Sequence, residues 1–458
     1  MELAYEMPYI PNIRGIILAG GAGSRIKPLT LKRTKSAIRF GGEHRLGEIV
    51  LTNMWRSGIR KIHFFTQSLY RSLSKDINLY YPVRSSSLDT YSIEIDPIQH
   101  RYGEEWSEGS GETLYYHRNL LEDTNEDDIA VFGGDHVYFM NIKQMLDHHK
   151  EMDADLTICA IPKKKSSCPI DNRDGTERIA FGVIKSLDNV VKGFEEKPSY
   201  DSLPEKIFAS MGNYIFKRES LLEILKEKPT DIAHDIVRIM LDRNMKVALY
   251  DYSTNEVPGM INEREKGYWM DIADIDLYFE ASMDLVNVEP RFNLYNPLWP
   301  MRDPPSKNVH SEGWIKGKRL GQMINSIFCP GIINSGATLY ESIISRNVRI
   351  HSYTEIYQSI LFPEVKIGRN CNIMNTIIDG EVIVPDNTSI GHDIAYDKSR
   401  GIHISPEGHR VVWKGYDFNF PRGYDPNKYI ESPDFEMTAI TLPKDLRENQ
   451  KDRLISEA

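Results

Sequence analysis

The sequence has little cysteine, with four residues among 458: Cys159, Cys168, Cys329 and Cys371. Their spacing fits no metal motif and is too sparse for a disulfide framework, which is consistent with reduced thiols. The chain also lacks any run approaching the ~20 apolar residues that a membrane-spanning helix needs. Its first residues have neither the basic nor the apolar segment of a signal peptide. We therefore expect a cytoplasmic protein without a membrane span.

Positive charge is not in excess either. The 56 lysines and arginines are outnumbered by 66 aspartates and glutamates, which gives a net charge of −10 and a pI near 5.8. This balance disfavours nucleic acid as the main partner. With 40% hydrophobic and 27% charged residues, the composition is that of a globular protein with a large core. The length indicates two or three domains.

Residues 14–290 alternate short β-branched runs with longer segments of helical periodicity. This alternation predicts an α/β domain with a mostly parallel, Rossmann-like sheet that is covered by helices on both faces. The expected strands are 15–18, 61–66, 129–132, 156–160, 181–184 and 213–216. The expected helices include 46–55, 110–121, 142–150 and 219–226.

Five prolines between Pro290 and Pro305 interrupt this pattern. Because proline ends helices and cannot donate to a β-ladder, we predict that the α/β domain spans 1–290 and that a proline-rich linker spans 291–320. No repeat is visible in the tail, 411–458.

Between the linker and the tail, apolar residues recur in steps of six, five and six, so that the pattern repeats every 17 residues. The series is Ile333, Leu339, Ile344, Ile350, Ile356, Leu361, Ile367, Ile373, Ile378, Val384 and Ile390. Hexapeptide periodicity of this kind predicts a parallel β-helix over 321–410, and an ordinary β-sandwich is the alternative.

A glycine-rich stretch, LAGGAGSRIKPLT, follows the first expected strand at residues 18–30. It is not a P-loop, because Arg25-Ile26 follows Gly23-Ser24 where that motif needs lysine and serine or threonine. It is not a Rossmann fingerprint, because Ile26 replaces the third glycine. What remains is a backbone loop with cations behind it, which suits a polyphosphate. The alternative is a tight glycine turn with solvated charges.

Two aspartates fall where strands are expected to end. Asp135 follows two glycines in VFGGDHVY, and Asp271 follows two aromatic residues in YWMD. Mg²⁺ takes one or two carboxylates together with phosphate oxygens, and cations offset the charge of a departing pyrophosphate. The combination favours metal-assisted nucleotide chemistry, although each aspartate alone is also compatible with a cap or a turn.

Several stretches together resemble the ADP-glucose pyrophosphorylases, also called glucose-1-phosphate adenylyltransferases, in order and spacing. They are LAGGAGSRIKPLT, KRTKSAIRFGG, PIQHRYGEEW, GGDHVY, AFGVI, FEEKP, ASMGNYIF, AHD and YWMD. The resemblance covers residues 14 to about 410 and implies a nucleotidyltransferase sheet followed by a left-handed β-helix. The reaction it implies is attack of a sugar 1-phosphate oxygen on the α-phosphorus of a nucleoside triphosphate, with release of pyrophosphate.

The resemblance also implies roles for individual residues. Arg25 and Lys35 bind the triphosphate and the pyrophosphate, and Asp135 and Asp271 hold Mg²⁺. The implied nucleotide-binding residues are Leu18, Gly20, Gly21, Gly23, Gln67, Gln99, Trp106, Gly109, Ser110 and Gly134. The implied sugar-phosphate-binding residues are Glu196, Lys197, Ser210, Asp235 and Trp269, with Lys197 on the phosphate. Lys32 matches a lysine of the activator site.

The chain departs from the family's pattern around the base and the sugar. Glu108 replaces an arginine of the base-side loop, and Ala273-Asp274 replaces Gly-Thr after the second metal aspartate. The expected substrates are ATP and glucose 1-phosphate. One alternative is a cyclitol or modified-sugar phosphate, or GTP, in secondary metabolism; another is a non-catalytic regulatory subunit. By resemblance we also expect a homotetramer, assembled partly through the β-helix.

Overall fold

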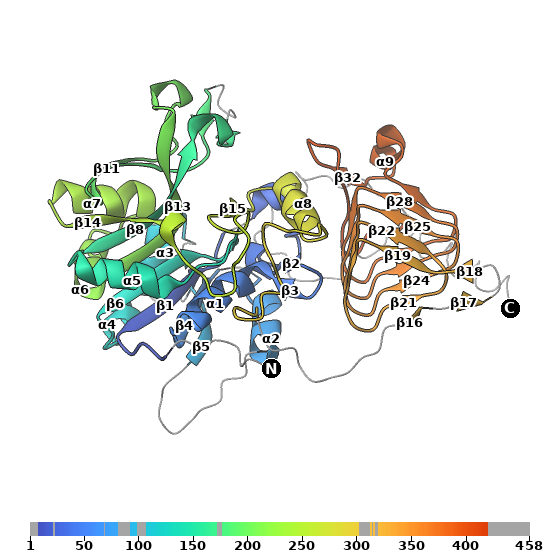
Figure 1. Cartoon of the computed structure of the whole chain (residues 1–458), viewed down its shortest axis with the longest axis horizontal. Coiled ribbons are helices and arrows are strands. Elements are labelled where there is room, and N and C mark those ends of the chain that lie inside the picture. Colours follow the sequence, from blue (N-terminus) through green and yellow to red (C-terminus); the bar gives the residue numbers. More distant parts are fainter. Residues whose placement is uncertain are drawn as a thin grey trace, which may run out of the picture. The chain divides into compact units, whose positions relative to one another are not determined.

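The computed structural model, drawn in Figure 1, describes residues 8–21, 23–67, 69–80, 92–98, 107–171, 176–301, 312–313, 315–316 and 319–419. Gln99 and Trp106 lie outside these residues. The described parts of both predicted domains belong to one compact unit. Of the helices in these ranges, none is both long and apolar enough to cross a bilayer.

A nine-stranded sheet with the order β11-β12-β14-β8-β13-β6-β1-β4-β5 forms the centre of the N-terminal domain. Its strands are apolar on both faces because each face packs into a separate core cluster: Ile17 belongs to one and Ile16 to the other. The strands are β1 (Ile13–Leu18), β4 (Lys61–Thr66), β5 (Ser92–Pro97), β6 (Asp128–Gly133), β8 (Leu156–Lys164), β11 (Val183–Leu187), β12 (Val190–Glu195), β13 (Lys206–Lys217) and β14 (Val247–Asp251).

The sheet is more mixed than the sequence predicts. β1 runs parallel to β4 and β6, β4 to β5, and β8 to β14. The long strand β13 is antiparallel to both β6 and β8, and β11 and β12 form a hairpin. A parallel neighbour needs a crossover of about a dozen residues or more, whereas only residues 188–189 connect β11 to β12. Parallel pairing is therefore continuous only in the half that carries the glycine loop.

The helix expected over 110–121 is divided in two at His117. The His117 ring stacks on Phe65 at 3.9 Å, and its Nδ1 lies 2.8 Å from the Thr113 carbonyl oxygen. These contacts fix a break that helical periodicity does not reveal. The α-helices of the described ranges are α1 (Leu46–Arg56), α2 (Arg71–Tyr80), α3 (Ser110–Tyr116), α4 (Arg118–Glu122), α5 (Ile142–Glu151), α6 (Arg218–Leu225), α7 (Val237–Asp242), α8 (Ile275–Asp284) and α9 (Ile394–Ser399).

Short elements complete the N-terminal domain. The single turns are η1 (Ser24–Ile26), η2 (Lys35–Ala37), η3 (Lys165–Ser167), η4 (Tyr200–Ser202), η5 (Ile232–Ile236) and η6 (Tyr252–Thr254). The two-residue strands are β2 (Arg39–Phe40), β3 (His44–Arg45), β7 (His136–Val137), β9 (Ile170–Asp171), β10 (Arg178–Ile179) and β15 (Met270–Asp271).

The first part of the predicted linker packs against α1. Trp299 is fully buried, and its indole Nε1 donates to Asn53 Oδ1 at 3.3 Å. The Thr52 hydroxyl donates to the carbonyl oxygen of Met301 at 2.6 Å. Residues 291–301 therefore pack as part of the N-terminal domain.

The C-terminal domain is the predicted parallel β-helix, with three sheets that stack one strand from each coil (Figure 1). The first sheet contains β16 (Glu312–Gly313), β21 (Ile333–Asn334), β24 (Arg349–Ile350), β27 (Lys366–Ile367) and β30 (Ile383–Val384). The second contains β19 (Gln322–Ile324), β22 (Thr338–Tyr340), β25 (Glu355–Tyr357), β28 (Asn372–Met374) and β31 (Ser389–Ile390). The third contains β20 (Ile327–Phe328), β23 (Ile343–Ile344), β26 (Ile360–Leu361), β29 (Thr376–Ile378), β33 (Arg410–Val412) and β32 (His403–Ile404). A separate hairpin joins β17 (Ile315–Lys316) to β18 (Arg319–Leu320).

Of the predicted inward series, every position from Leu339 to Ile390 lies in the β-helix core. Ile333 is an exception, because Asn334 and not Ile333 pairs with Ile350. The step from Asn334 to Ile350 is 16 residues, one fewer than the 17 residues from Ile350 to Ile367 and from Ile367 to Val384. Asn334 is fully buried, and its side-chain oxygen accepts from the Ala337 amide at 2.8 Å.

The third sheet of the β-helix turns its outward side chains toward the N-terminal domain. Ile343, Ile360 and Ile377 share one core cluster with Phe40 and Tyr278. Beside this cluster, the Arg33 guanidinium donates to both carboxylate oxygens of Asp379, at 2.8 and 3.0 Å. Apolar burial and a two-pronged ion pair thus join the two domains.

Candidate active site

The glycine loop lies at the carboxyl edge of the parallel half of the sheet, where ligands bind in folds of this class. β1, β4 and β6 are neighbours there, and the Gly134 amide donates to the carbonyl oxygen of Leu18 at 3.0 Å. A Cβ atom at Gly20 would lie 3.0 Å from Gln67 Cγ. Gln67 Nε2 in turn donates to the Ser107 carbonyl oxygen at 3.1 Å. Four of the predicted nucleotide-binding residues therefore meet at one edge.

Two of the glycines at this edge leave no room for a side chain. Gly23 has a φ of 59°, in the left-handed region, and a Cβ atom there would lie 2.8 Å from Thr30 Cγ2. A Cβ atom at Gly134 would lie 2.8 Å from Ser36 Oγ. Gly21, by contrast, has no atom within 4 Å of its would-be Cβ, so this part of the loop is open to a ligand.

A two-stranded ribbon brings the two predicted metal ligands together. β7 pairs antiparallel with β15, with His136 opposite Asp271. The Ile272 amide donates to the Asp135 carbonyl oxygen at 3.3 Å, which ties the two segments together next to the ribbon. Sequence positions 135 and 271 thus become neighbours at the end of β6.

Lys35 lies against both aspartates. Its Nζ is 2.5 Å from Asp135 Oδ2 and 3.7 Å from Asp271 Oδ1. Burial alone lowers the pKa of Lys35, but the attraction of the two carboxylates outweighs burial and raises it. Burial raises the pKa of Asp135, and the charge of Lys35 overcomes this and holds that pKa well below its ordinary value. Both groups are therefore held in their charged forms.

The residues present fit a divalent cation. Asp135, His136 and Asp271 each offer one ligand atom, and these atoms lie within 4.8 Å of one another. Two carboxylates together with the phosphate oxygens of a nucleotide form the donor set that Mg²⁺ takes. The Asp274 carboxylate is engaged by the next helix, because its Oδ1 accepts from the Leu277 amide at 2.9 Å as the N-cap of α8.

Trp269 lies between the metal ligands and the predicted sugar side. Its ring meets His136 edge-on at 5.5 Å and Phe181 at 5.7 Å. Lys163 Nζ lies 5.0 Å from the Trp269 ring, and burial lowers the pKa of Lys163. The indole Nε1 of Trp269 is buried and finds no hydrogen-bond partner within the described ranges. A bound ligand would supply an acceptor for this donor.

Gly182 contacts two more of the predicted residues, Ser210 and Glu196. Its carbonyl oxygen accepts from the Ser210 amide at 2.8 Å, and a Cβ atom on it would lie 2.8 Å from Glu196 Oε2. Burial, followed by the charge of Asp231, raises the pKa of Glu196. Lys197 has a φ of 46°, a conformation that costs a non-glycine residue about 1 kcal/mol or more. Strain of this kind is typical of functional positions.

Two predicted ligand-binding residues are engaged with the protein itself. Ser110 Oγ donates to Asp231 Oδ2 at 2.8 Å and accepts from the Ile232 amide at 2.9 Å. Asp235 Oδ2 accepts from the amides of Thr230 and Asp231, at 2.9 and 3.0 Å. Gly109 packs on this same segment, since a Cβ atom there would lie 2.3 Å from the Thr230 carbonyl oxygen. These contacts fix the shape of the two segments that carry Gly109, Ser110 and Asp235. Ligand roles for these three residues stay predictions.

The two remaining predicted cations lie in different places. Arg25 is exposed beside the glycine loop. Lys32 lies at the junction of the domains, where a Cβ atom at Gly415 would be 3.1 Å from its Nζ. Its effector role stays a prediction.

Sequence reasoning missed three residues of this site: His136, Lys163 and Phe181. His136 stands beside Asp135 in the quoted GGDHVY stretch, and Phe181 stands in AFGVI. For both residues, a signal was therefore present in the sequence. Lys163 is one of three consecutive lysines, and nothing in that run distinguishes it.

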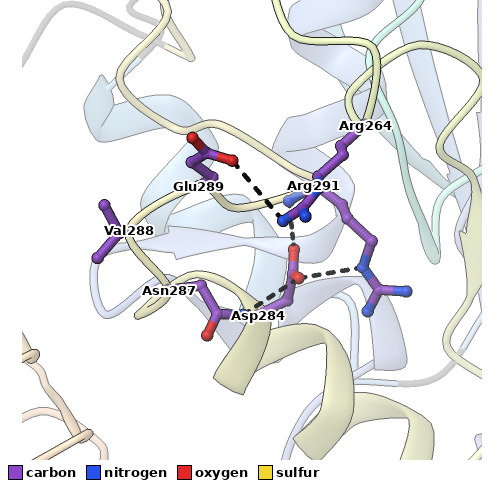
Figure 2. A pocket seen from close by; sticks show the side chains of 6 residues that line it. All are labelled: Arg264, Asp284, Asn287, Val288, Glu289 and Arg291. Carbon is purple, nitrogen blue, oxygen red and sulfur yellow. Dashed lines mark hydrogen bonds and ion pairs between the residues drawn. The ribbon is translucent and has the colours of Figure 1, made fainter.

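A separate hollow of about 790 Å³ follows the end of α8 (Figure 2). Its charges are paired within its own wall: Arg291 Nε lies 3.0 Å from Asp284 Oδ1, and Arg264 lies 3.7 Å from Glu289. Val288 on its rim is 94% exposed. The hollow presents no uncompensated charge of one sign, and we assign it no ligand.

Comparisons with known proteins find relatives of both domains. Residues 14–288 match the Nucleotidyl transferase family, and residues 304–412 match the GlmU-like C-terminal hexapeptide family, whose repeat forms a left-handed β-helix. The chain is 41% identical over 426 residues to a glucose-1-phosphate adenylyltransferase of Thermus thermophilus, covering 89% of this chain and 99% of the relative. It is 42% identical over 421 residues to that of Anaeromyxobacter dehalogenans, covering 88% and 98%. The enzyme of Geobacter metallireducens is 38% identical over 415 residues, covering 88% and 97%.

Proposed function

The chain belongs to the glucose-1-phosphate adenylyltransferase family of nucleotidyl transferases, and we propose that it makes ADP-glucose and pyrophosphate from ATP and glucose 1-phosphate. The observation that carries the proposal is the Lys35–Asp135–Asp271 cluster at the carboxyl edge of β6, beside the open glycine loop. A regulatory subunit without activity would have no need of this cluster.

In this reaction a phosphate oxygen of the sugar phosphate attacks the α-phosphorus of ATP. A new P–O bond forms as the bond from the α-phosphorus to the bridging oxygen breaks, and that oxygen leaves with pyrophosphate. No protein nucleophile is needed, so positioning and charge stabilisation supply the catalysis. When bound by Asp135 and Asp271, Mg²⁺ supplies positive charge to the phosphate oxygens.

The side chains divide the remaining work. The glycine-loop amides bind phosphate oxygens, and Arg25 and Lys35 offset the charge of the leaving pyrophosphate. Lys197 binds the phosphate of the sugar phosphate, while Trp269 offers the sugar its indole N–H, which has no hydrogen-bond partner among the described residues. We assign Glu196 and Ser210 to hydrogen bonds with the sugar hydroxyls.

The test follows two labels of ATP. With ³²P at the α-position, label appears in a sugar nucleotide that comigrates with ADP-glucose; with ³²P at the γ-position, label appears in pyrophosphate. Transfer of the γ-label to sugar, or its release as orthophosphate, contradicts the proposal.

We further propose that the chain self-associates through the second sheet of the β-helix. Outward side chains Ile324, Tyr340, Tyr357 and Met374 form a column in register, with the two tyrosine rings stacked at 4.8 Å. With a two-fold axis between the two tyrosines, Tyr340 of one copy packs against Tyr357 of the second copy. Ile324 of one copy then packs against Met374 of the second. The same axis sets Glu355 opposite Thr338, so no like charges meet. The homotetramer and the cytoplasmic setting stay predictions.

A further inference from the structure

His136 is placed beside the two metal aspartates by the same ribbon that joins them. Its Nε2 lies 3.5 Å from Asp135 Oδ1 and 3.7 Å from Asp271 Oδ1. The residue is 9% exposed, so its ring is inside the site and not on the surface. Its polar edge therefore faces the position where the carboxylates converge.

These separations suit three ligands of one ion. Octahedral coordination with bonds of about 2.1 Å places adjacent ligand atoms about 3.0 Å apart and opposite ones about 4.2 Å apart. The two His136 distances fall between these limits. Shifts of a few tenths of an ångström would bring all three atoms onto a common ion.

The ring is held in this orientation by its neighbours. Trp269 meets it edge-on, and would-be Cβ atoms at Gly133 and Gly212 would lie 3.3 and 3.5 Å from its Cε1. The other ring nitrogen, Nδ1, is buried and has no hydrogen-bond partner in the described part of the chain. Nδ1 can therefore carry the ring proton when a cation lies between the carboxylates, and the Nε2 lone pair then faces that cation.

The ammonium group of Lys35 lies between the two carboxylates, where a metal ion would bind. It contacts Asp135 at 2.5 Å and approaches Asp271 at 3.7 Å, so in this structure it neutralises the carboxylates. A metal ion that takes these carboxylates leaves the ammonium for the phosphates of the nucleotide.

We propose that His136 is a third protein ligand of the catalytic metal, through Nε2, and that it sets the choice of metal. A first-row transition-metal ion such as Mn²⁺ or Co²⁺ accepts an imidazole ligand more readily than Mg²⁺ does, because Mg²⁺ is bound through oxygen ligands. The site would therefore bind Mn²⁺ better, relative to Mg²⁺, than two carboxylates would. This inference rests on the proposed function, because it takes Asp135 and Asp271 as the metal's other ligands.

The test uses the full chain with Mn²⁺ and inorganic pyrophosphate, which contains no nitrogen. Pulsed electron paramagnetic resonance should detect a ¹⁴N nucleus coupled to the manganese. Protein grown with ¹⁵N-labelled histidine should show the ¹⁵N pattern instead, which requires no variant to fold. In His136→Gln the nitrogen coupling should vanish, while in the matched control His392→Gln, on the β-helix, it should persist.

A second measurement compares metal affinities by calorimetry. The ratio of the Mg²⁺ to the Mn²⁺ dissociation constant should fall about tenfold in His136→Gln and stay unchanged in His392→Gln. Absence of nitrogen coupling in the unmodified protein, or coupling that survives in His136→Gln, overturns the inference. These readouts are independent of turnover: adenylyl transfer without nitrogen coupling refutes the inference alone, whereas coupling without transfer refutes the proposed function alone.

Discussion

The β7–β15 strand pair brings Asp135 and Asp271 close together, yet their side chains keep 30% and 36% of their surface exposed. Their carboxylates are therefore not structural groups of a sealed core. Replacing either with asparagine keeps the shape but removes a charge that a hard cation requires.

We predict that Asp135→Asn and Asp271→Asn each reduce kcat by orders of magnitude with little change in thermal stability. Pyrophosphate release at saturating Mg²⁺ and thermal denaturation measure the two effects. Asp274→Asn is the matched control, since asparagine also caps a helix, and its activity should be near normal. Near-normal activity of Asp135→Asn or Asp271→Asn would show that the replaced aspartate serves only as a cap.

Lys197 is the cation assigned to the sugar phosphate. A hydrogen bond between charged groups contributes about 1.5–3 kcal/mol, so Lys197→Met should raise KM for glucose 1-phosphate by roughly 10- to 150-fold. KM for ATP should change little. Lys192→Met, at an exposed lysine on the preceding strand β12, is the control. An equal rise of KM for ATP would place Lys197 outside the sugar-phosphate pocket.

At the scale of elements, helix α8 follows shortly after β15, the strand that carries Asp271. Asp274 is its N-cap, and loss of such a cap costs about 1 kcal/mol. We predict that Asp274→Ala lowers the free energy of unfolding by about this amount, as Asn141→Ala should at the N-cap of α5. Denaturant titration measures the loss, and kcat should change less than about threefold. A collapse of activity without loss of stability would mean that Asp274 acts at the metal.

The sequence predicts elements best where periodicity and position act together. The strand over 61–66 and the helix starting at Leu46 are found as predicted, because a buried strand and an amphipathic helix carry their pattern locally. The break at His117 and the bulge that lets Ser210 and Asn213 pair with adjacent residues of β8 depend on contacts far along the chain. Such contacts leave no local period.

The same contrast holds within the site. Asp135 and Lys35 follow from their motifs, and the structure brings them to 2.5 Å. Lys163 could not be predicted, because its contact with Trp269 joins β8 to a residue more than 100 positions away. The family resemblance assigns Asp235 to the sugar-phosphate site. The hydrogen bonds that Asp235 accepts from the Thr230 and Asp231 amides are visible only in three dimensions.

At the scale of the whole molecule, the β-helix has one face against the N-terminal domain and another that carries the tyrosine column. We predict that truncation before Gly321 gives aggregated or smaller species, because it exposes Phe40 and Tyr278 and removes the proposed contact between copies. Sedimentation velocity measures the size. A monodisperse, fully active monomer of residues 1–320 would contradict this.

A point substitution separates assembly from folding. Tyr357→Glu places a charge in the column and should shift the full chain toward smaller species. Tyr353→Glu is the matched control, since Tyr353 is 63% exposed at a corner of the β-helix and lies outside the column. Equal effects of the two substitutions would place the contact between copies elsewhere.

The central claim is that this site transfers the adenylyl group of ATP to glucose 1-phosphate. The most direct measurement is a panel of nucleoside triphosphates against sugar and cyclitol phosphates, read as kcat/KM from pyrophosphate release. ATP with glucose 1-phosphate should give the highest value in the panel. A preference of more than about 100-fold, close to 3 kcal/mol, for GTP or for a cyclitol phosphate would contradict the account.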